Sequence, residues 1–280
     1  MTIINGKIIA QKVLADIKGN PANKNISIAA VSVSNSLAIK SFIEMKKKYA
    51  ESVGMKLYEY NFKPGTPEDE IIRKLGELDK DNNITGIIVE IPLAPGYNTE
   101  KLLNAVPIEK DIDALSVIAQ ENFYNDDFRV SGHTPTLVPP AVRALEILLN
   151  EHKVNLEGKT AAVFGQGVLI GKPISHWLEG RCKEVFRIDE DTNEPEKLCL
   201  QSDIVVSGVG KPNLIRGEMI KEGAVVVDFG FERFNGKSVG DVDFNTVSPK
   251  ASLITPVPGG MGPIVIAAFL KNVQDLSLAR

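Results

Sequence analysis

Short runs of β-prone apolar residues recur along this 280-residue chain, and segments with helical periodicity separate them. Three such runs cover residues 26–33, 85–92 and 159–164, and two more cover 203–208 and 223–230. Continuous apolar runs are typical of strands that are buried on both faces of a sheet. Their alternation with helices predicts an α/β fold with parallel strand pairing.

The composition indicates a globular protein with a small-molecule partner. Hydrophobic residues make up 43% of the chain and charged residues 24%, with a formal net charge of -4. The Lys and Arg residues are scattered, so we expect no nucleic-acid partner. The two cysteines lack metal-ligand spacing, so we expect no metal site. No apolar run approaches the ~18 residues that cross a bilayer, and residues 1–19 do not resemble a signal peptide. We therefore expect a cytoplasmic protein with no membrane partner.

Two acidic features in the first half of the chain could contact a ligand. Glu90 stands at the carboxyl end of the run 85–92, where open α/β sheets bind ligands. Asp111 and Asp113 are two residues apart and share a face in an extended segment. One of them could bind the amino or amide edge of a ligand. The alternative for each feature is a carboxylate that is simply hydrated at the surface.

A glycine-rich turn follows the run 159–164 and opens a helix. Its spacing, Gly-x-Gly-x-x-x-Gly over 165–171, is one residue longer than the dinucleotide fingerprint. Small residues let a pyrophosphate approach the N–H groups at the helix start. Asp189 ends the next strand and could accept both adenosine-ribose hydroxyls, although a hydrated acidic loop is the alternative. Residues 208–211 form a further loop at the edge expected for the nicotinamide half of a cofactor. The predicted cofactor-binding residues are Gly165, Gln166, Gly167, Gly171, Pro173, Asp189, Gly208, Gly210 and Lys211.

A second glycine turn, Thr255-Pro-Val-Pro-Gly-Gly-Met-Gly-Pro263, lies near the C-terminus. Its three glycines permit backbone geometries closed to other residues, and Pro263 suits the first position of a helix. Free N–H groups in such a turn can bind a carboxylate or phosphate, although a plain helix-entry loop is the alternative. We predict a ligand turn that opens a helix over about 262–275. The predicted substrate-binding residues are Val257, Gly259, Gly260, Gly262 and Pro263.

The expected architecture has two domains with a ligand cleft between them. The boundary precedes an amphipathic helix at 141–150, and residues 120–133 form an irregular connection. We predict an N-terminal α/β domain over 1–139, completed by the C-terminal helix at 262–280. Residues 140–261 form a Rossmann-type domain with a doubly wound parallel sheet.

These motifs together resemble the methylenetetrahydrofolate dehydrogenase/cyclohydrolase family of the FolD type. The matches cover the whole chain, and the most specific are Gly86-Ile-Ile-Val-x-x-Pro-Leu93, Lys110-Asp-Ile-Asp113, Gly165 to Pro173, Val239-Gly-Asp-Val-Asp243 and Thr255 to Pro263. The resemblance implies oxidation of 5,10-methylenetetrahydrofolate to the methenyl form with NAD or NADP, and then hydrolysis to 10-formyltetrahydrofolate. It also implies a folate cleft, in which the aspartate matching Asp113 orients the pterin, and a homodimer.

The chain departs from this family at its catalytic positions. In the family a Tyr-x-x-x-Lys pair and a Gln carry the hydrolytic step. Lys46 matches the lysine, whereas Phe42 replaces the tyrosine and Glu90 replaces the glutamine. Phe42 and Lys46 are four residues apart and share one helix face, and Glu90 could pair with Lys46 and hold it charged. We therefore predict that catalytic positions Lys46, Phe42, Glu90 and Asp113 retain dehydrogenase activity, with cyclohydrolase activity weak or absent.

The cofactor loop also departs from the family. Gln166-Gly167 replaces the usual Arg-Ser, and Asp189-Glu190 replaces the usual His-Ser, which favours NAD over NADP because positive charge is lost and negative charge gained. Two alternatives stay open. The fold could act on a different pterin that carries a one-carbon unit, or the protein could be an inactive paralogue that binds a nucleotide or folate. Retention of Lys46 and Asp113 speaks against the second.

Overall fold

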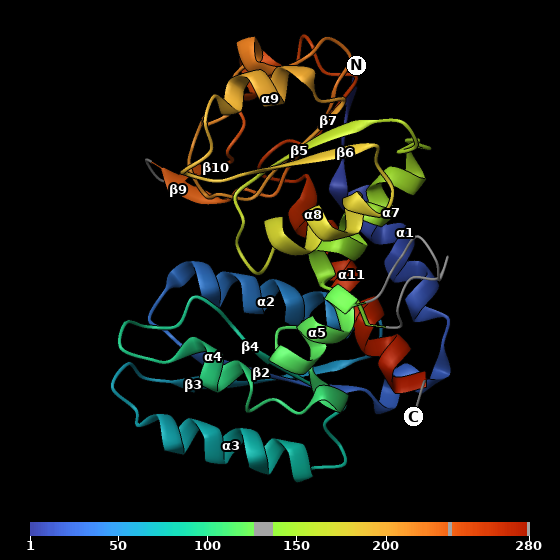
Figure 1. Ribbon diagram of the computed structural model, residues 1–280. Helices are drawn as coiled ribbons and strands as arrows, with labels where there is room; N and C mark the ends of the chain where they lie inside the picture. Colours follow the sequence, from blue (N-terminus) through green and yellow to red (C-terminus); the bar gives the residue numbers. More distant parts are fainter. Residues whose placement is uncertain (126–136, 235–236, 279–280) are drawn as a thin grey trace. The chain divides into compact units, whose positions relative to one another are not determined.

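The computed structural model describes residues 1–125, 137–234 and 237–278, and it confirms the predicted α/β fold (Figure 1). The described chain forms two compact units. Unit one contains residues 1–10 and 141–265, and unit two contains residues 11–125, 137–140 and 266–278. The domain limits expected from the sequence stay a prediction.

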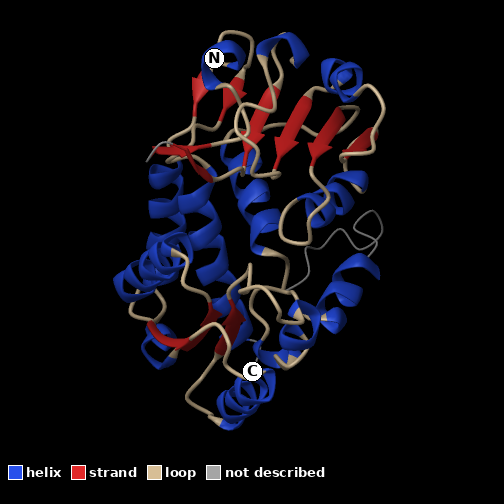
Figure 2. Cartoon of the chain, turned by 90° about the vertical axis from the view of Figure 1, so that its left-hand side faces the viewer, coloured by secondary structure: helices blue, strands red, loops and turns tan. Residues whose placement is uncertain are grey.

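Unit one is built on a six-stranded sheet with the strand order β1-β11-β8-β7-β5-β6, in which all the pairs are parallel. Figure 2 shows these strands side by side. The strands of this sheet are β1 (Thr2–Ile3), β5 (Thr160–Phe164), β6 (Glu184–Ile188), β7 (Ile204–Ser207), β8 (Val225–Asp228) and β11 (Leu253–Ile254). Phe164 pairs with Ser207, and Ser207 pairs with Asp228. The loops that follow β5, β7 and β8 therefore begin at the same edge of the sheet.

Helices and a small hairpin complete unit one. They are α7 (Pro140–Glu151), α8 (Gly171–Glu179), α9 (Pro195–Gln201), α10 (Phe244–Val247), the 3-10 helix η3 (Gly217–Met219) and the hairpin of β9 (Glu232–Phe234) with β10 (Lys237–Val239). Three of the described helices contribute residues to both units: α1 (Gly6–Lys18), α11 (Met261–Leu278) and α7, of which only Pro140 belongs to unit two.

Unit two is built on a three-stranded parallel sheet with the order β3-β2-β4. The strands are β2 (Ser27–Val33), β3 (Lys56–Phe62) and β4 (Gly86–Val89). The helices are α2 (Leu37–Ser52), α3 (Glu68–Lys80), α4 (Thr99–Leu103) and α5 (Val117–Asn125), with 3-10 turns η1 (Pro21–Asn25) and η2 (Ile108–Lys110). Every residue of β2 and of β4 is buried, as expected for strands covered on both faces.

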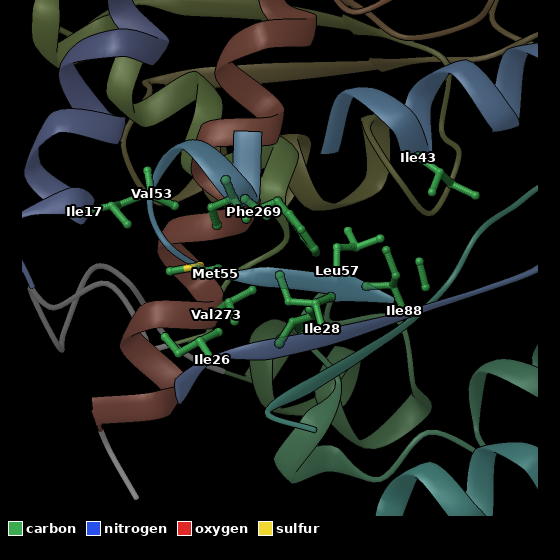
Figure 3. Packing of buried hydrophobic residues seen from close by; sticks show 14 residues of the cluster. Ile17, Ile26, Ile28, Ile43, Val53, Met55, Leu57, Ile88, Phe269 and Val273 are labelled. Atoms are coloured by element: carbon green, nitrogen blue, oxygen red, sulfur yellow. The ribbon is translucent and has the colours of Figure 1, made fainter. Parts of the chain in front are cut away.

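The core of unit two explains where α2 and α11 lie against this sheet. Ile28 and Ile88 contribute side chains from β2 and β4, and Ile43 contributes one from α2. Phe269 and Val273 extend from α11 into the same cluster (Figure 3). Phe269 is 1% exposed, so the C-terminal helix is a structural part of this unit. Burial of such side chains contributes about 1.5–3 kcal/mol each.

Most elements lie within two residues of the predicted bounds, but three predictions need correction. Residues 120–125 were expected to be irregular and belong to α5, whose first N–H groups have side-chain acceptors: Val117 donates to Oδ1 of Asn104 at 2.7 Å, and Ala119 donates to Oγ of Ser116 at 3.3 Å. Residues 126–133 of that prediction lie outside the described part of the chain. The last helix begins at Met261, so Pro263 is its third residue rather than its first. Glu90 follows β4 rather than belonging to it.

Candidate functional site

Lys46 is the centre of a buried polar group in unit two. It lies on α2, and its side chain is 6% exposed. Its Nζ atom lies 2.7 Å from Oε1 of Glu90, whose side chain is 7% exposed. The predicted pairing of these two residues is confirmed. A buried ammonium requires such a partner, because an isolated charge at this depth would be strongly destabilised.

The position of Glu90 follows from the strand that precedes it. β4 ends at Val89, and the Glu90 N–H still donates to the carbonyl of Val31 on β2 at 2.8 Å. The side chain therefore leaves the carboxyl end of the parallel sheet, where open α/β sheets bind ligands.

Two aromatic rings flank the Lys46 ammonium. Nζ lies 5.0 Å from the ring centre of Phe42 and 4.9 Å from that of Phe269. Phe42 lies one helical turn before Lys46 on α2, as the spacing predicted. Both rings attract a cation through their negative faces, and neither can donate or accept a proton. Sequence reasoning missed Phe269, because its helix lies more than 200 residues away in the chain.

The electrostatics of this group favour a charged lysine. Burial lowers the pKa of Lys46, but the negative charges of Glu90 and Asp113 and the hydrogen bond to Glu90 outweigh it and raise the pKa above its ordinary value. Burial also raises the pKa of Asp113 to about 6, with Glu90 adding to the shift and Lys46 opposing it. Asp113 therefore titrates close to neutral pH.

Hydrogen bonds of the Lys110 and Asp111 side chains fix the segment that leads to Asp113. The Lys110 ammonium donates to the carbonyls of Leu78 at 3.0 Å, Asp79 at 2.6 Å and Asp81 at 2.9 Å, close to the end of α3. The Asp111 carboxylate accepts the backbone N–H groups of Leu115 and Ser116, which precede α5. The sequence left both aspartates as ligand candidates. The structure brings Asp113 to Lys46 and Glu90, whereas the Asp111 carboxylate binds the backbone of the turn before α5.

In unit one, the turn from Gly165 to Gly171 connects β5 to α8. Gly165 has a positive φ of 83°, and a Cβ at Gly171 would lie 1.5 Å from the Gly165 carbonyl oxygen. Only glycine fits there. At Gly167 an added Cβ would meet no atom within 4 Å, so this part of the turn has open space beside it. Pro173 is buried within α8. A glycine turn that opens onto a helix N-terminus suits a phosphate group.

Gln166 in that turn and Asp189 after β6 differ in burial and in the hydrogen bonds of their side chains. The Gln166 amide donates to the Val163 carbonyl at 3.0 Å and accepts from the Ser175 hydroxyl at 3.4 Å, so this side chain is held against its own strand and helix. Asp189 follows β6 and is exposed. Its Oδ1 accepts from the Asp191 N–H and the Thr192 hydroxyl.

The loop with Gly208, Gly210 and Lys211 packs against the glycine turn. A Cβ at Gly208 would lie 2.4 Å from Cγ2 of Ile170, and one at Gly165 would lie 2.9 Å from Cγ2 of Val209. The structure thus brings the two predicted cofactor loops together at the carboxyl ends of β5 and β7.

The C-terminal glycine turn packs on the start of α1. The Gly6 N–H donates to the Gly259 carbonyl at 2.9 Å, and a Cβ at Gly6 would lie 1.8 Å from the Gly260 carbonyl oxygen. Gly259 has a positive φ of 99°, and the Gly260 N–H donates to the Pro256 carbonyl at 2.8 Å. At Gly262 an added Cβ would meet nothing within 4 Å. These residues belong to unit one, whereas the Lys46 group belongs to unit two.

The described residues contain no group of three His, Cys, Asp or Glu side chains that could hold a metal ion. Among the same residues, no helix is long and apolar enough to cross a membrane.

Comparison with known proteins assigns the chain to one family. Residues 4–113 match the catalytic domain of tetrahydrofolate dehydrogenase/cyclohydrolase, and residues 139–279 match its NAD(P)-binding domain. The bifunctional protein FolD of Moorella thermoacetica is 35% identical over 279 residues, which cover 98% of this chain and 97% of that protein. FolD of Mycoplasmopsis synoviae is 34% identical over 284 residues, 99% of each chain. The crystal structure of the bifunctional enzyme FolD from Campylobacter jejuni aligns with a TM-score of 0.93 at 30% identity, covering 100% of this chain and 99% of that one. This chain therefore belongs to the tetrahydrofolate dehydrogenase/cyclohydrolase family.

Proposed function

We propose that this protein oxidises 5,10-methylenetetrahydrofolate to 5,10-methenyltetrahydrofolate, with NAD as the preferred acceptor, and that it hydrolyses the methenyl product only weakly. Family membership supports the first part. One observation carries the second: Nζ of Lys46 lies 2.7 Å from Oε1 of Glu90, in a buried site that Phe42 lines with an apolar ring.

Oxidation requires the protein mainly to position the folate carbon against the nicotinamide, because the substrate nitrogens stabilise the cation that forms. The bound nicotinamide cofactor supplies the hydride acceptor. The turn from Gly165 to Gly171 and the loop with Gly208, Gly210 and Lys211 fit such a cofactor, since they combine open space with N–H groups at a helix start. Asp113, with its pKa near 6, can hydrogen-bond the polar edge of a pterin.

Hydrolysis asks for more, because a water must add to the methenyl carbon and protons must then move. A useful acid or base has a pKa near the working pH. The raised pKa of Lys46 keeps the ammonium charged, and Phe42 has no hydroxyl with which to exchange a proton. This arrangement supports weak cyclohydrolase activity.

The preference for NAD rests on Asp189. Its exposed carboxylate follows β6, where the adenosine ribose of a dinucleotide is expected. A carboxylate there accepts ribose hydroxyls and repels a 2′-phosphate. Gln166 adds no compensating positive charge, because a side-chain amide is neutral, and its hydrogen bonds to Val163 and Ser175 hold it in place.

The dehydrogenase assay follows the methenyl absorbance with NAD and NADP side by side. We expect a higher kcat/KM with NAD. Asp189→Ser should lower the ratio of kcat/KM with NAD to kcat/KM with NADP. Asp191→Ser, which changes an exposed aspartate two residues away, should leave this ratio unchanged. Reduction of neither cofactor would contradict the proposal and favour an inactive paralogue. Thermal shifts with other pterins but none with tetrahydrofolate would favour a different one-carbon carrier.

The cyclohydrolase assay starts from methenyltetrahydrofolate and follows its decay above the rate in buffer. We expect little acceleration by the natural protein and a clear gain in the double variant Phe42→Tyr/Glu90→Gln, which restores the two family residues. Decay as fast as that of a bifunctional relative would contradict weak hydrolysis while leaving the dehydrogenase proposal intact. We also propose a homodimer on the family resemblance, and sedimentation equilibrium tests it.

A further inference from the structure

Two buried aspartates in unit one have no part in the proposed chemistry. Asp228 ends β8 and is 2% exposed, and Asp241 follows β10 and is 0% exposed. Neither forms an ion pair among the described residues; their partners are N–H groups and one hydroxyl. Buried carboxylates with so many backbone donors fix the shape of the loops around them.

The donors to Asp241 come from the last residue of β7 and from the loop that follows it. Its Oδ2 accepts from the Ser207 hydroxyl and from the Val209 N–H, both at 2.7 Å. Its Oδ1 accepts from the Lys211 N–H at 2.8 Å. This is the loop that packs on the glycine turn, since a Cβ at Gly165 would lie 2.9 Å from Val209. Asp241 therefore sets where the loop lies beside the turn.

Asp228 holds Asp241 in place in turn. Its Oδ1 accepts from the Gly230 N–H at 2.7 Å and the Asp241 N–H at 3.2 Å, and its Oδ2 accepts from the Val242 N–H at 3.0 Å. Its own N–H donates to the Thr255 hydroxyl at 2.7 Å. The two carboxylates thus connect β8, the segment after β10 and the loop after β7.

Close packing leaves these carboxylates no alternative position. A Cβ at Gly230 would lie 2.3 Å from Cγ of Asp241, and a Cβ at Gly240 would lie 2.1 Å from Oδ2 of Asp228. Side chains at positions 230 and 240 would displace the carboxylates, which explains why both positions are glycine. The segment Val239 to Asp243, which the sequence showed only as a family motif, therefore has a physical role here.

We propose that Asp241 is a positioning residue for the cofactor: it holds residues 207–211 in the shape that the nicotinamide half requires, and Asp228 holds Asp241. This inference rests on the proposed function, because it assumes that this loop contacts a nicotinamide cofactor. Asp241 acts through the loop and touches neither the cofactor nor the folate.

The test uses Asp241→Asn in the full-length protein. The amide has the same size but presents an NH2 group to donors, so it loses at least one of the three hydrogen bonds. The matched control is Asp203→Asn. Asp203 lies at the opposite end of β7, where it accepts from the Thr160 N–H at 3.1 Å and pairs with Lys221 at 2.7 Å.

Binding of NADH is measured by energy transfer from Trp177, the chain's single tryptophan, which lies on α8 after the glycine turn. We expect Asp241→Asn to raise the Kd for NADH at least tenfold, and Asp203→Asn to change it less than twofold. In steady state the KM for the cofactor should rise while the KM for methylenetetrahydrofolate stays within twofold.

Amide hydrogen exchange shows whether the loop itself has changed. The N–H groups of Val209 and Lys211 should exchange faster in Asp241→Asn, while those within β5 keep their protection. Circular dichroism and thermal melting establish that both variants are folded. If Asp241→Asn does not fold, Ser207→Ala removes one donor and should raise the Kd for NADH measurably.

The outcomes separate this inference from the proposed function. If the natural protein shows no energy transfer to NADH, the proposed function fails. If the natural protein binds NADH and folded Asp241→Asn binds it equally well, Asp241 is only structural and the inference is overturned. A tenfold loss in both variants would also overturn it, since the effect would then follow general destabilisation.

Discussion

Replacing Glu90 with Gln tests the view that a buried ion pair keeps Lys46 charged. The substitution preserves the volume of the side chain and one oxygen that can accept from Nζ, so packing around the site should persist. It removes the negative charge that lies 2.7 Å from the ammonium. The ammonium then has Asp113 as its nearest counter-charge, together with the rings of Phe42 and Phe269.

The cost in stability can be worked from this geometry. Two unit charges 2.7 Å apart attract by roughly 6 kcal/mol at an effective dielectric constant of about 20. Desolvation of both groups opposes this attraction, and removing one partner of a buried pair costs about 3–5 kcal/mol. The retained hydrogen bond and the charge of Asp113 place the expected loss near the lower end, at about 3 kcal/mol.

The pH dependence gives a sharper signature than the size of the loss. Desolvation of Lys46 is a larger effect than its attraction to Asp113, so without Glu90 the pKa of Lys46 should fall below the model-peptide value of 10.5. In the natural protein, where this pKa is raised, Lys46 contributes no slope below 10.5, and its stabilisation is lost as the pH rises from 10.5 through the folded pKa. In Glu90→Gln, the unfolded state binds more protons, so stability should rise with pH up to about 10.5.

Urea unfolding at several values between pH 7 and 10 measures this difference. The loss caused by Glu90→Gln should shrink as the pH rises. The control is Glu59→Gln, because Glu59 pairs with the neighbouring Lys47 at 3.6 Å and these side chains are 23% and 44% exposed. Its loss should stay within about 1 kcal/mol with no trend. A loss by Glu90→Gln that is independent of pH, or below about 1 kcal/mol, would refute the view that Glu90 keeps Lys46 charged.

Three further predictions concern the same framework. Because the pKa of Asp113 is raised to about 6, its protonated form stabilises the fold at low pH, and this stabilisation is lost as the pH rises through 6. Relative to the natural protein, Asp113→Asn should therefore gain about 1–2 kcal/mol of unfolding free energy between pH 4 and pH 7. Urea unfolding measures this gain, and an unchanged pH profile would contradict the prediction. Lys110→Met leaves three carbonyls near the end of α3 without their shared donor, and unfolding should show a loss of about 3 kcal/mol. Gly171→Ala should destabilise unit one by more than about 3 kcal/mol, because its Cβ would overlap Gly165. Gly167→Ala should keep a melting temperature close to that of the natural protein but weaken NADH binding. Equal melting temperatures for Gly171→Ala and the natural protein would contradict the first of these expectations.

The sequence predicted those features that depend on periodicity and on spacing within one element. Phe42 and Lys46 share a helix face because they are four residues apart, and Glu90 could be placed at a sheet edge because an apolar strand precedes it. Prediction of the ion pair also needed the family resemblance, which places Lys46 and Glu90 at neighbouring catalytic positions, and the structure contains that pair. The third partner of the ammonium, Phe269, comes from the other end of the chain, and local patterns do not encode that contact.

Features set by hydrogen bonds between loops escaped prediction for a physical reason. α5 has weak amphipathic periodicity, and its first N–H group donates to the Asn104 side chain, 13 residues earlier in the chain. The bonds from Asp241 to residues 207–211 join segments about 30 residues apart, and they require positions 230 and 240 to lack a Cβ, which would overlap the two carboxylates. A motif of small and acidic residues indicates that a site exists, but only the folded loops reveal which donors it binds.

The two departures from the family at the Lys46 site make physical sense as a pair. A glutamate in place of glutamine adds a buried charge, which is tolerable only because Lys46 neutralises it at 2.7 Å. Glu90 helps to raise the pKa of Lys46 and so favours the charged ammonium, and a phenyl ring at position 42 offers no hydroxyl for proton exchange. Phenylalanine also makes a favourable contact with the cation, at 5.0 Å. Burial raises the pKa of Asp113 in the same group to about 6, so this residue is suited to bind a pterin edge, in keeping with the proposed dehydrogenase that hydrolyses only weakly.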